Sequence, residues 1–305
     1  MRVMCGCLKH FKSFILKLKA LQYTFHEQLD ASFESQEVDS FFYILLEHYL
    51  GLRRITLALE PHYEITDTEA KPFFLALERL KNSEPIQYII GETEFYGLPF
   101  QVNPYTLIPR PETEELVEWI IESVKNRGDV SSEIKILDIG TGTGCIAISL
   151  AKQLPNTKVY ALDVSAEALK MAKKNADLNT VDVTFFENNI LTIGNAVLQP
   201  ELKFDIIVSN PPYVRELEKQ EMKTNVLAHE PHLALFVEND APLVFYKAIS
   251  QFAKQNLKAN GQLFFEINEY LGQEMITMLE DDAFKNVVLK QDIFKKDRMI
   301  KGHIN

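Results

Sequence analysis

A short apolar segment followed by a glycine-rich turn constrains the fold of this chain more than any other feature. Residues 134–139 (IKILDI) form the apolar run, residues 140–144 (GTGTG) place glycine at alternate positions, and residues 145–151 (CIAISLA) favour a helix. A strand, a tight glycine turn and a helix in this order begin a doubly wound nucleotide-binding unit. Glycine lets the backbone turn sharply and approach a ligand closely. The spacing differs from the dinucleotide pattern G-x-G-x-x-G.

A second motif, Asn210-Pro211-Pro212-Tyr213, follows the apolar run 204–209 (FDIIVS), which is typical of a buried parallel strand. The prolines restrict the backbone, so the turn loses little conformational entropy when a ligand binds. The Asn210 side-chain oxygen and a backbone carbonyl of the turn can accept both hydrogens of one planar NH2 group, on which Tyr213 can stack. The motif therefore indicates a site that orients an amide or exocyclic amine nitrogen for attack. Taken alone, an ordinary proline turn is an equally good interpretation.

An acidic residue also ends the next predicted strand. Residues 158–162 form that strand, and Asp163 follows it. A carboxylate in this position can accept hydrogen bonds from both hydroxyls of a ribose. The alternative is a helix cap, a role that Ser165 could also fill.

The glycine loop resembles the Asp-x-Gly-x-Gly-x-Gly loop of S-adenosylmethionine-dependent methyltransferases. The resemblance implies that Asp138 binds the ammonium group of the cofactor's methionine part. It also implies that the cofactor contacts the loop residues Gly140, Thr141, Gly142, Thr143 and Gly144.

Further segments extend the resemblance from about residue 35 to the C-terminus. They are residues 91–98 (GETEFYGL), residues 106–114 (TLIPRPETE) and His229-Glu230-Pro231. With the two motifs, they are similar to segments of the HemK/PrmC family, which methylates a glutamine side-chain nitrogen in class I peptide chain release factors. The glycine loop and the Asn-Pro-Pro-Tyr motif are shared with other methyltransferases, whereas residues 108–114 are much more particular to this family.

The family resemblance implies an α/β fold of the class I S-adenosylmethionine-dependent methyltransferases. We expect a doubly wound, seven-stranded, mostly parallel sheet, a small N-terminal helical domain and a linking β-hairpin. The implied reaction moves a methyl group from S-adenosyl-L-methionine to the glutamine of a Gly-Gly-Gln motif and leaves S-adenosyl-L-homocysteine. The leaving group is neutral, so the chemistry requires neither a metal nor a covalent intermediate.

The resemblance also suggests roles for single residues. Asn210 and the Pro211 carbonyl would accept the amide hydrogens, Pro212 would stiffen the turn, and Asn210 would also contact the cofactor. Arg110 would lie over the methionine end of the cofactor, although an interdomain salt bridge is the competing interpretation. Ile190 would cover the adenine ring. Asn189, where the family often has Asp, would bind the adenine edge or would simply be a turn asparagine.

The first ninety residues show helical periodicity with many aromatic residues at apolar positions. Thr66-Asp67-Thr68-Glu69 is a capping-box pattern, and Pro61 and Pro85 mark breaks. We expect three parts: residues 1–92 as a helical substrate-docking domain, 93–105 as a hairpin linker and 106–305 as the catalytic domain. The residues expected to pack the helical core are Phe14, Leu18, Leu21, Phe25, Phe41, Phe42, Leu45, Leu46, Tyr49, Leu50, Phe73, Phe74, Leu77 and Leu80.

Strands and helices alternate over the rest of the chain, as they do in a parallel sheet covered on both faces. A hairpin is expected around Gly97-Leu98. Helices are expected near residues 111–127, 145–154, 165–178, 241–257 and 270–280. Strands are expected near residues 134–139, 157–162, 183–187, 204–209, 261–267, 286–291 and 297–304. The family resemblance implies that one of the last two strands inserts antiparallel.

Composition limits the partners and the compartment. The net charge of −11 argues against stable nucleic-acid binding but allows an acidic protein to recognise a basic partner. The three cysteines, Cys5, Cys7 and Cys145, show no metal spacing and favour a reducing compartment. No run of 18 apolar residues predicts a membrane span, and residues 1–7 do not resemble a secretion signal but an unstructured extension. We expect a cytoplasmic monomer with a release factor as its partner.

Three other functions fit parts of the same pattern. A ribosomal-protein glutamine methyltransferase would share every active-site feature and differ in its docking domain. An adenine-N6 nucleic-acid methyltransferase would bind an amine with the same hydrogen-bonding face, but the acidic composition counts against it. The intact Gly140, Gly142, Asp163 and Asn210 count against a non-catalytic S-adenosylmethionine-binding protein.

Overall fold

The computed structural model describes residues 15–127, 133–193, 202–222 and 224–304, and these divide into two compact units. The first unit ends at Ile90 and the second begins at Gly91. The extension with Cys5 and Cys7 lies outside the described residues, as does Phe14. The division into a docking domain, a linker and a catalytic domain stays a prediction.

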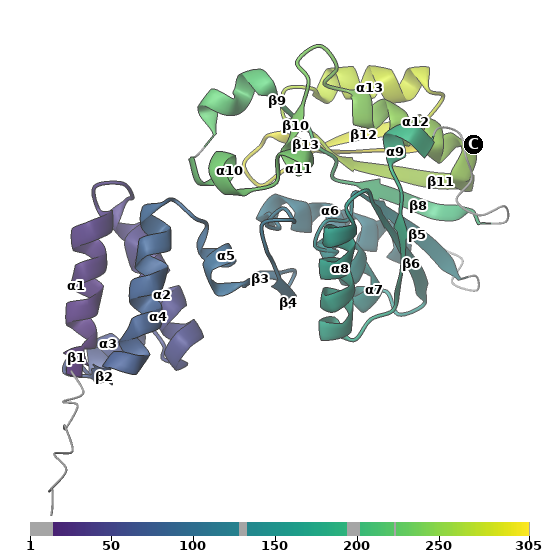
Figure 1. Ribbon diagram of the computed structural model, residues 1–305. Helices are drawn as coiled ribbons and strands as arrows, with labels where there is room; N and C mark the ends of the chain where they lie inside the picture. Colours follow the sequence, from purple (N-terminus) through teal and green to yellow (C-terminus); the bar gives the residue numbers. More distant parts are fainter. Residues whose placement is uncertain (1–14, 128–132, 194–201, 223, 305) are drawn as a thin grey trace, which may run out of the picture. The chain divides into compact units, whose positions relative to one another are not determined.

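The first unit is helical, as predicted (Figure 1). Its helices are α1 (Leu18–Leu29), α2 (Ser35–Leu50), α3 (Ile55–Leu59), α4 (Asp67–Lys81) and α5 (Ile86–Ile90). Two strands that the sequence did not predict, β1 (Ile15–Lys17) and β2 (Glu64–Thr66), pair antiparallel. Each has three residues, which is too short to show the alternation that identifies a strand.

Apolar stripes on α1, α2 and α4 build the core of this unit. The Thr66 hydroxyl accepts from the Glu69 N–H at 3.3 Å and the Thr66 N–H donates to Glu69 Oε2 at 2.8 Å, so the predicted capping box is confirmed. Phe74 was wrongly placed in the core, because it is 42% exposed. It lies one residue off the stripe that Phe73, Leu77 and Leu80 form at spacings of four and three residues.

The second unit contains a seven-stranded sheet in the order β12-β13-β11-β8-β5-β6-β7. Its strands are β5 (Ile134–Ile139), β6 (Thr157–Asp163), β7 (Val183–Glu187), β8 (Phe204–Ser209), β11 (Leu257–Glu266), β12 (Lys285–Gln291) and β13 (Asp297–His303). Neighbouring strands from β11 to β7 are parallel, and β13 runs antiparallel to both β11 and β12. The predicted fold class and the antiparallel insertion are therefore confirmed.

Helices cover both faces of this sheet, and successive strand residues face opposite layers. Ile136 of β5 packs in one core with α6 (Pro111–Lys125) and α7 (Cys145–Gln153). Leu137 packs in the other core with α12 (Val244–Asn256) and α13 (Gly272–Asp281). The second unit also contains α8 (Ala166–Asn179), α9 (Ile190–Ile193), α10 (Thr224–His229), α11 (His232–Leu235), the 3-10 helix η1 (Glu216–Glu221) and the strands β9 (Val214–Arg215) and β10 (Phe236–Val237).

The hairpin of β3 (Glu92–Phe95) and β4 (Leu98–Gln101) forms, but its turn is Tyr96-Gly97 rather than Gly97-Leu98. Tyr96 and Gly97 have φ angles of 52° and 70°, the combination that a type I′ turn requires. The hairpin is held on α8, because Asn175 Oδ1 accepts from the Gln101 N–H at 2.7 Å and Asn179 Nδ2 donates to the Pro99 carbonyl at 2.8 Å.

Candidate active site

A cavity of about 280 Å³ opens at the carboxyl ends of β5, β6 and β8. From β5 the chain continues to β6 on one side, whereas β8 lies on the other side, so the cavity occupies the point where the strand order reverses. Ligands of doubly wound sheets bind at such a point. The lining is mainly apolar, which is usual for a small-molecule site, and the volume lies close to the lower end of the roughly 300–1,000 Å³ range of such sites.

The glycine loop joins β5 to α7 and forms one wall of this cavity through Gly140 and Gly142. Both glycines, and Gly144, have positive φ angles, which a residue with a side chain rarely adopts. At Gly144 a Cβ would also lie 2.8 Å from Ile148 Cδ1 and 3.2 Å from Ala172 Cβ. Gly144 therefore allows the loop to pack against α7 and α8, while the first two glycines face the cavity.

Asp138 is fully buried directly before this loop. Its Oδ2 accepts from the Thr141 hydroxyl at 2.6 Å, whereas its Oδ1 is buried without a hydrogen-bond partner among the described residues. Burial raises the pKa of Asp138 to about 7, and the Thr141 hydroxyl opposes this rise. A buried acceptor without a partner fits a ligand that brings a cation or an N–H donor, such as an ammonium group.

Asp163 lines the cavity at the end of β6 and is 9% exposed. Its Oδ2 accepts from the Gly142 N–H and its Oδ1 from the Ser165 N–H, both at 2.9 Å. Burial raises the pKa of Asp163, and these backbone donors oppose the rise. The helix cap of α8 is Ser165, whose hydroxyl oxygen accepts from the Ala168 N–H at 3.2 Å.

The segment that follows β7 also lines the cavity, through Asn188, Asn189 and Ile190. Asn189 Oδ1 accepts from the Leu191 N–H at 2.9 Å and so begins the short helix α9. This is the turn role that the sequence offered as one alternative for Asn189. The Nδ2 group and the second lone pair of Oδ1 are the parts that could contact a ligand.

The Asn210-Pro211-Pro212 segment lines the cavity beyond the end of β8. Asn210 Nδ2 donates to Thr113 Oγ1 of α6 at 3.4 Å. Tyr213 does not line the cavity. Its hydroxyl donates to Glu266 Oε1 at 3.1 Å, and its ring packs partly against the core. Burial and the neighbouring carboxylate of Glu266 raise the pKa of Tyr213, so the phenol stays neutral.

Arg110 does not line the cavity and pairs with a residue of its own unit. Its Nη2 lies 2.5 Å from Oε1 of Glu230, whose side chain is 1% exposed, and Glu230 Oε2 accepts from the Ile108 N–H at 3.4 Å. The salt bridge expected as one alternative therefore forms, but within the second unit rather than between domains. The pair connects two segments that contribute Leu107 and Pro231 to the cavity wall.

The cavity brings together eight of the residues that the sequence suggested: Gly140, Gly142, Asp163, Asn189, Ile190, Asn210, Pro211 and Pro212. Asp138, Thr141, Thr143, Gly144, Arg110 and Tyr213 do not line it. The sequence analysis missed a large part of the wall: Pro104, Tyr105, Thr106, Leu107, Leu233, Ala234, Phe245 and Ile249. Thr106 and Leu107 belong to the 106–114 motif, so a signal was present there, but it was used only as evidence of the family resemblance.

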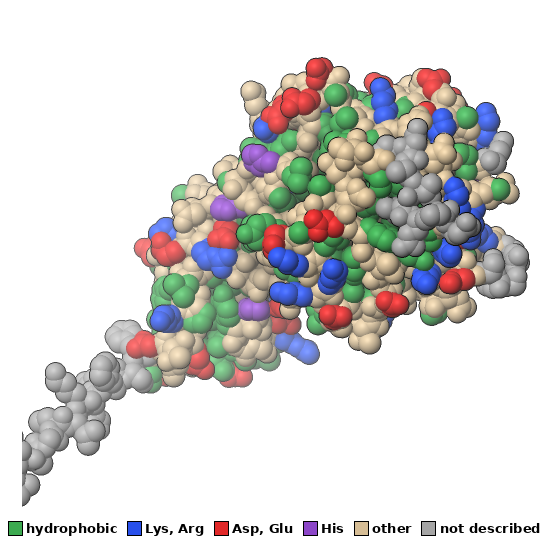
Figure 2. Space-filling view, turned by 45° about the vertical axis from the view of Figure 1, so that its right-hand side comes forward, with side chains coloured by type: hydrophobic (Ala, Val, Ile, Leu, Met, Phe, Trp, Pro, Cys, Tyr) green, Lys and Arg blue, Asp and Glu red, His purple; other side chains and the backbone are tan. Residues whose placement is uncertain are grey.

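The surface carries both signs of charge. On the face drawn in Figure 2, Lys and Arg side chains of the described residues are interspersed with Asp and Glu side chains. Among the described residues no three His, Cys, Asp or Glu side chains gather in a way that could hold a metal ion. None of the helices formed by these residues is sufficiently long and apolar to cross a membrane.

Comparisons with known proteins agree with this geometry. Residues 19–91 match the family model of the PrmC N-terminal domain, and residues 118–236 match that of the Methyltransferase small domain. The Release factor glutamine methyltransferase of Flavobacterium psychrophilum is 54% identical over 286 residues, which are 93% of this chain and 98% of that protein. The one of Bacteroides thetaiotaomicron is 42% identical over 274 residues, 90% of this chain and 95% of that protein. A solved METTL16 methyltransferase domain shares the fold, with a TM-score of 0.50 at 21% identity over 68% of this chain and 89% of that one.

Proposed function

This chain belongs to the family of release factor glutamine methyltransferases, and on that premise we propose the reaction and its residues. The chain transfers a methyl group from S-adenosyl-L-methionine to the side-chain amide nitrogen of the glutamine in the Gly-Gly-Gln motif of class I peptide chain release factors. S-adenosyl-L-homocysteine is the second product.

One observation carries the assignment of the site. The glycine loop, Asp163 and the Asn210-Pro211 turn come from three different strands, yet all of them line one cavity. A methyl donor and an amide acceptor must meet within a few ångströms, and a common cavity for the two motifs satisfies this requirement.

On the β5–β6 side, the chain's residues bind and orient the cofactor. Gly140 and Gly142 allow close approach, and the partnerless Oδ1 of Asp138 accepts from the ammonium group of the cofactor. The Asp163 carboxylate accepts from the ribose hydroxyls with the lone pairs that Gly142 and Ser165 leave free. The bound cofactor supplies an electrophilic methyl group on a sulfonium whose departure leaves a neutral thioether.

On the β8 side, the chain's residues hold the amide. An amide nitrogen is a poor nucleophile because its lone pair is delocalised. Asn210 Oδ1 and the Pro211 carbonyl accept its two hydrogens and hold the nitrogen toward the methyl group. These acceptors bind more strongly as the nitrogen becomes positive, which is differential stabilisation of the transition state. The nitrogen then releases one proton to water.

The first unit docks the release factor in this proposal. The match of residues 19–91 to the PrmC N-terminal domain supports a family-specific role for this unit. A docking role predicts that a free Gly-Gly-Gln peptide is methylated far more slowly than the whole factor. We further propose that the enzyme acts as a monomer in the cytoplasm, where release factors work, and binds no nucleic acid stably.

The proposal is tested by incubating the protein with S-adenosylmethionine labelled in its methyl group. Unmodified release factor, ribosomal protein and DNA are the three substrates. We expect label on the release factor only, at its Gly-Gly-Gln glutamine by mass spectrometry. A release factor with asparagine in place of that glutamine is the matched control, because the shorter side chain misplaces the nitrogen by more than about an ångström.

The other outcomes identify the alternatives. Label on ribosomal protein would indicate the sister activity, and label on DNA would indicate an adenine-N6 enzyme. Cofactor binding without label on any of the three would overturn the proposal.

A further inference from the structure

We propose that Glu266 is a positioning residue that decides which end of the Asn210 side-chain amide faces the cavity. This inference rests on the proposed role of Asn210 as the acceptor for the substrate amide. Glu266 is not part of the two motifs, does not line the cavity and was not suggested by the sequence. It acts through Thr113 and Asn210.

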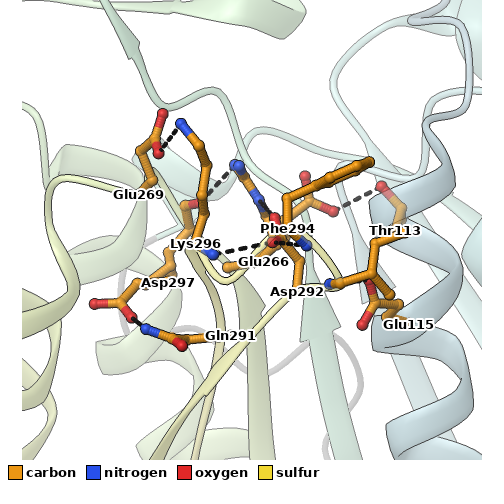
Figure 3. Close-up of polar contacts among 12 residues, drawn as sticks. Thr113, Glu115, Glu266, Glu269, Gln291, Asp292, Phe294, Lys296 and Asp297 are labelled. Carbon is orange, nitrogen blue, oxygen red and sulfur yellow. Dashed lines mark hydrogen bonds and ion pairs between the residues drawn. The ribbon is translucent and has the colours of Figure 1, made fainter.

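Glu266 is the last residue of β11 and is 1% exposed. Its Oε2 accepts from the Thr113 hydroxyl at 2.6 Å, and its Oε1 accepts from the Tyr213 hydroxyl at 3.1 Å. Figure 3 shows Thr113 on its helix pointing toward Glu266. One buried carboxylate therefore accepts hydrogen bonds both from Thr113, which contacts Asn210, and from Tyr213, the last residue of the Asn-Pro-Pro-Tyr motif.

The order of donors along this chain of hydrogen bonds sets the orientation of Asn210. A carboxylate only accepts hydrogen bonds, so the Thr113 hydroxyl must donate its only proton to Glu266. The Thr113 oxygen then has only lone pairs left for its other neighbour. It can bind the Nδ2 end of Asn210, which lies 3.4 Å away, but it cannot bind the Oδ1 end.

This orientation leaves Asn210 Oδ1 as the end of the amide that can accept a hydrogen bond from the substrate. Because Nδ2 is turned toward Thr113, Asn210 Oδ1 is turned away from it, and this oxygen accepts no hydrogen bond from any of the described residues. Without this constraint the two ends of an asparagine amide have nearly the same shape and can exchange by a rotation of the side chain. A flipped amide would present a donor to a substrate group that itself has only hydrogens to offer.

Both oxygens of Glu266 accept from hydroxyl groups, which is the pattern of a carboxylate that only accepts. Burial raises the pKa of Glu266 and the nearby carboxylate of Glu112 adds to this rise, while the Thr113 hydroxyl, the Arg298 guanidinium and the Tyr213 hydroxyl oppose it. Arg298 is itself held by Asp292, whose Oδ2 accepts from Nε at 3.1 Å. The Asp292 carboxylate also binds the backbone of the loop between β12 and β13, as Figure 3 shows, so the guanidinium has a rigid support.

The central experiment uses Glu266→Gln, which keeps the size of the side chain but adds a donor. Its NH2 group can donate to Thr113, whose hydroxyl then turns to Asn210 and selects the Oδ1 end. We expect the turnover of whole release factor at saturating concentration to fall at least tenfold. The affinity for S-adenosylhomocysteine by calorimetry should stay within twofold, because the cofactor contacts lie on the β5–β6 side.

A double-mutant cycle separates positioning from general damage. If Glu266 acts through Asn210, then Glu266→Gln should change turnover less than twofold in an Asn210→Ala background. Additive losses in the cycle would overturn the inference. Tyr246→Phe is the matched control, since the Tyr246 hydroxyl donates to the backbone carbonyl of Glu266 at 3.2 Å and does not touch its carboxylate. This control should lower stability and leave turnover within twofold.

If the Glu266→Gln protein does not fold, a second pair of variants and a spectroscopic measurement test the inference instead. Thr113→Val should lose turnover at least tenfold, whereas Thr113→Ser, which keeps the hydroxyl, should stay within threefold of the wild type. In the wild-type protein, NMR should show cross-relaxation between the Asn210 Nδ2 protons and the Thr113 methyl group. The absence of that signal, or equal turnover of the valine and serine variants, would overturn the inference. A wild-type protein that methylates no release factor would instead overturn the proposed function, because the NMR signal reports the amide orientation without any turnover.

Discussion

The two sides of the candidate active site are held in place by different kinds of contact. On the β5–β6 side, Thr141 donates to Asp138 three residues away, and the Gly142 N–H donates to Asp163, 21 residues away. On the β8 side, Asn210 donates to Thr113 across 97 residues of sequence. Tyr213 and Thr113 donate to Glu266 across 53 and 153 residues.

This difference separates what one supersecondary unit can build from what requires the whole sheet. The cofactor side lies within one βαβ unit, so its glycines and carboxylates come into place when that unit forms. The substrate side also needs α6 and β11 in their final positions. We therefore expect substitutions on the β8 side to change turnover and those on the β5–β6 side to change cofactor binding.

The largest expected effect is that of Asn210→Ala on turnover. The substitution removes an acceptor that matters most when the amide nitrogen becomes cationic. Turnover with saturating release factor should fall by about a hundredfold or more, as for other preorganised hydrogen-bond partners of a developing charge. Steady-state kinetics with labelled cofactor measures the loss, and calorimetry should show only a small change in S-adenosylhomocysteine affinity.

Two further variants accompany this measurement, one as a control and one as a second test of the acceptor. Asn179→Ala removes another buried amide of the same unit, which donates to the Pro99 and Asn175 carbonyls. None of these three residues lines the cavity, so the substitution should reduce stability without a comparable loss of turnover. Asn210→Asp keeps the acceptor but adds charge and cannot donate to Thr113. Near-normal turnover of Asn210→Ala together with lost cofactor affinity would make Asn210 a cofactor residue and refute the amide-holding role.

On the other side, Asp163→Ala should weaken cofactor binding by about 1.5–3 kcal/mol, the range for hydrogen bonds to a charged group. The reason is the loss of the ribose acceptor and of the support that the carboxylate gives to the Gly142 N–H. Titration calorimetry with S-adenosylhomocysteine measures the change. Asp205→Ala is the control, because Asp205 binds Lys258 and the Lys135 N–H near the start of β8. If both variants bind equally well, the ribose does not contact Asp163.

The sequence predicts the features that depend on short segments better than those that depend on distant ones. The elements of the sheet, the glycine loop and the position of Asp163 were predicted correctly, because each depends on a short pattern of apolar residues and turns. The turn of the hairpin was misplaced by one residue, since Tyr96 occupies a positive φ angle that sequence alone does not assign to tyrosine. The strand β11 begins at Leu257 rather than near residue 261, and its pairing with β8 shifts register between Leu257 and Gln262.

Contacts over long sequence distances were not predicted. Nothing in the residues around Glu266 or Thr113 indicates that they meet, because their approach depends on how α6 lies beside β11. The contribution of Leu233 and Phe245 to the cavity wall was also missed, because a leucine or phenylalanine on a helix is more often a core residue than a ligand contact. A motif therefore indicates residues that line the cavity, but not the residues from distant segments that contact them.

A smaller effect, on stability, is expected for Arg110→Ala. The Glu230 carboxylate is 1% exposed and would lose its cation, but Arg110 is 34% exposed and water can replace part of the interaction. We expect a loss of about 1–2 kcal/mol, between the values for surface and buried pairs. Denaturant unfolding measures it. Lys170→Ala, which breaks the exposed pair with Glu167, is the matched control and should leave stability nearly unchanged, because water screens an exposed pair. Equal effects of the two variants would show that the Arg110 pair does not hold the cavity wall.

The smallest expected effect is a pH dependence of cofactor binding through Asp138. Burial raises the pKa of its carboxyl to about 7, whereas an unfolded aspartate titrates near about 3.9. The folded protein therefore keeps a proton on Asp138 that the unfolded chain loses, so the contribution of this group to stability is present below about pH 4 and disappears as the pH rises to about 7. A ligand ammonium favours the ionised carboxyl, so the affinity for S-adenosylhomocysteine should rise severalfold from pH 6 to pH 8. Calorimetry at both pH values, with Asp138→Asn as the control that should show no such rise, measures it. An equal rise in both proteins would assign the pH dependence to another group and leave Asp138 without a role at the ammonium.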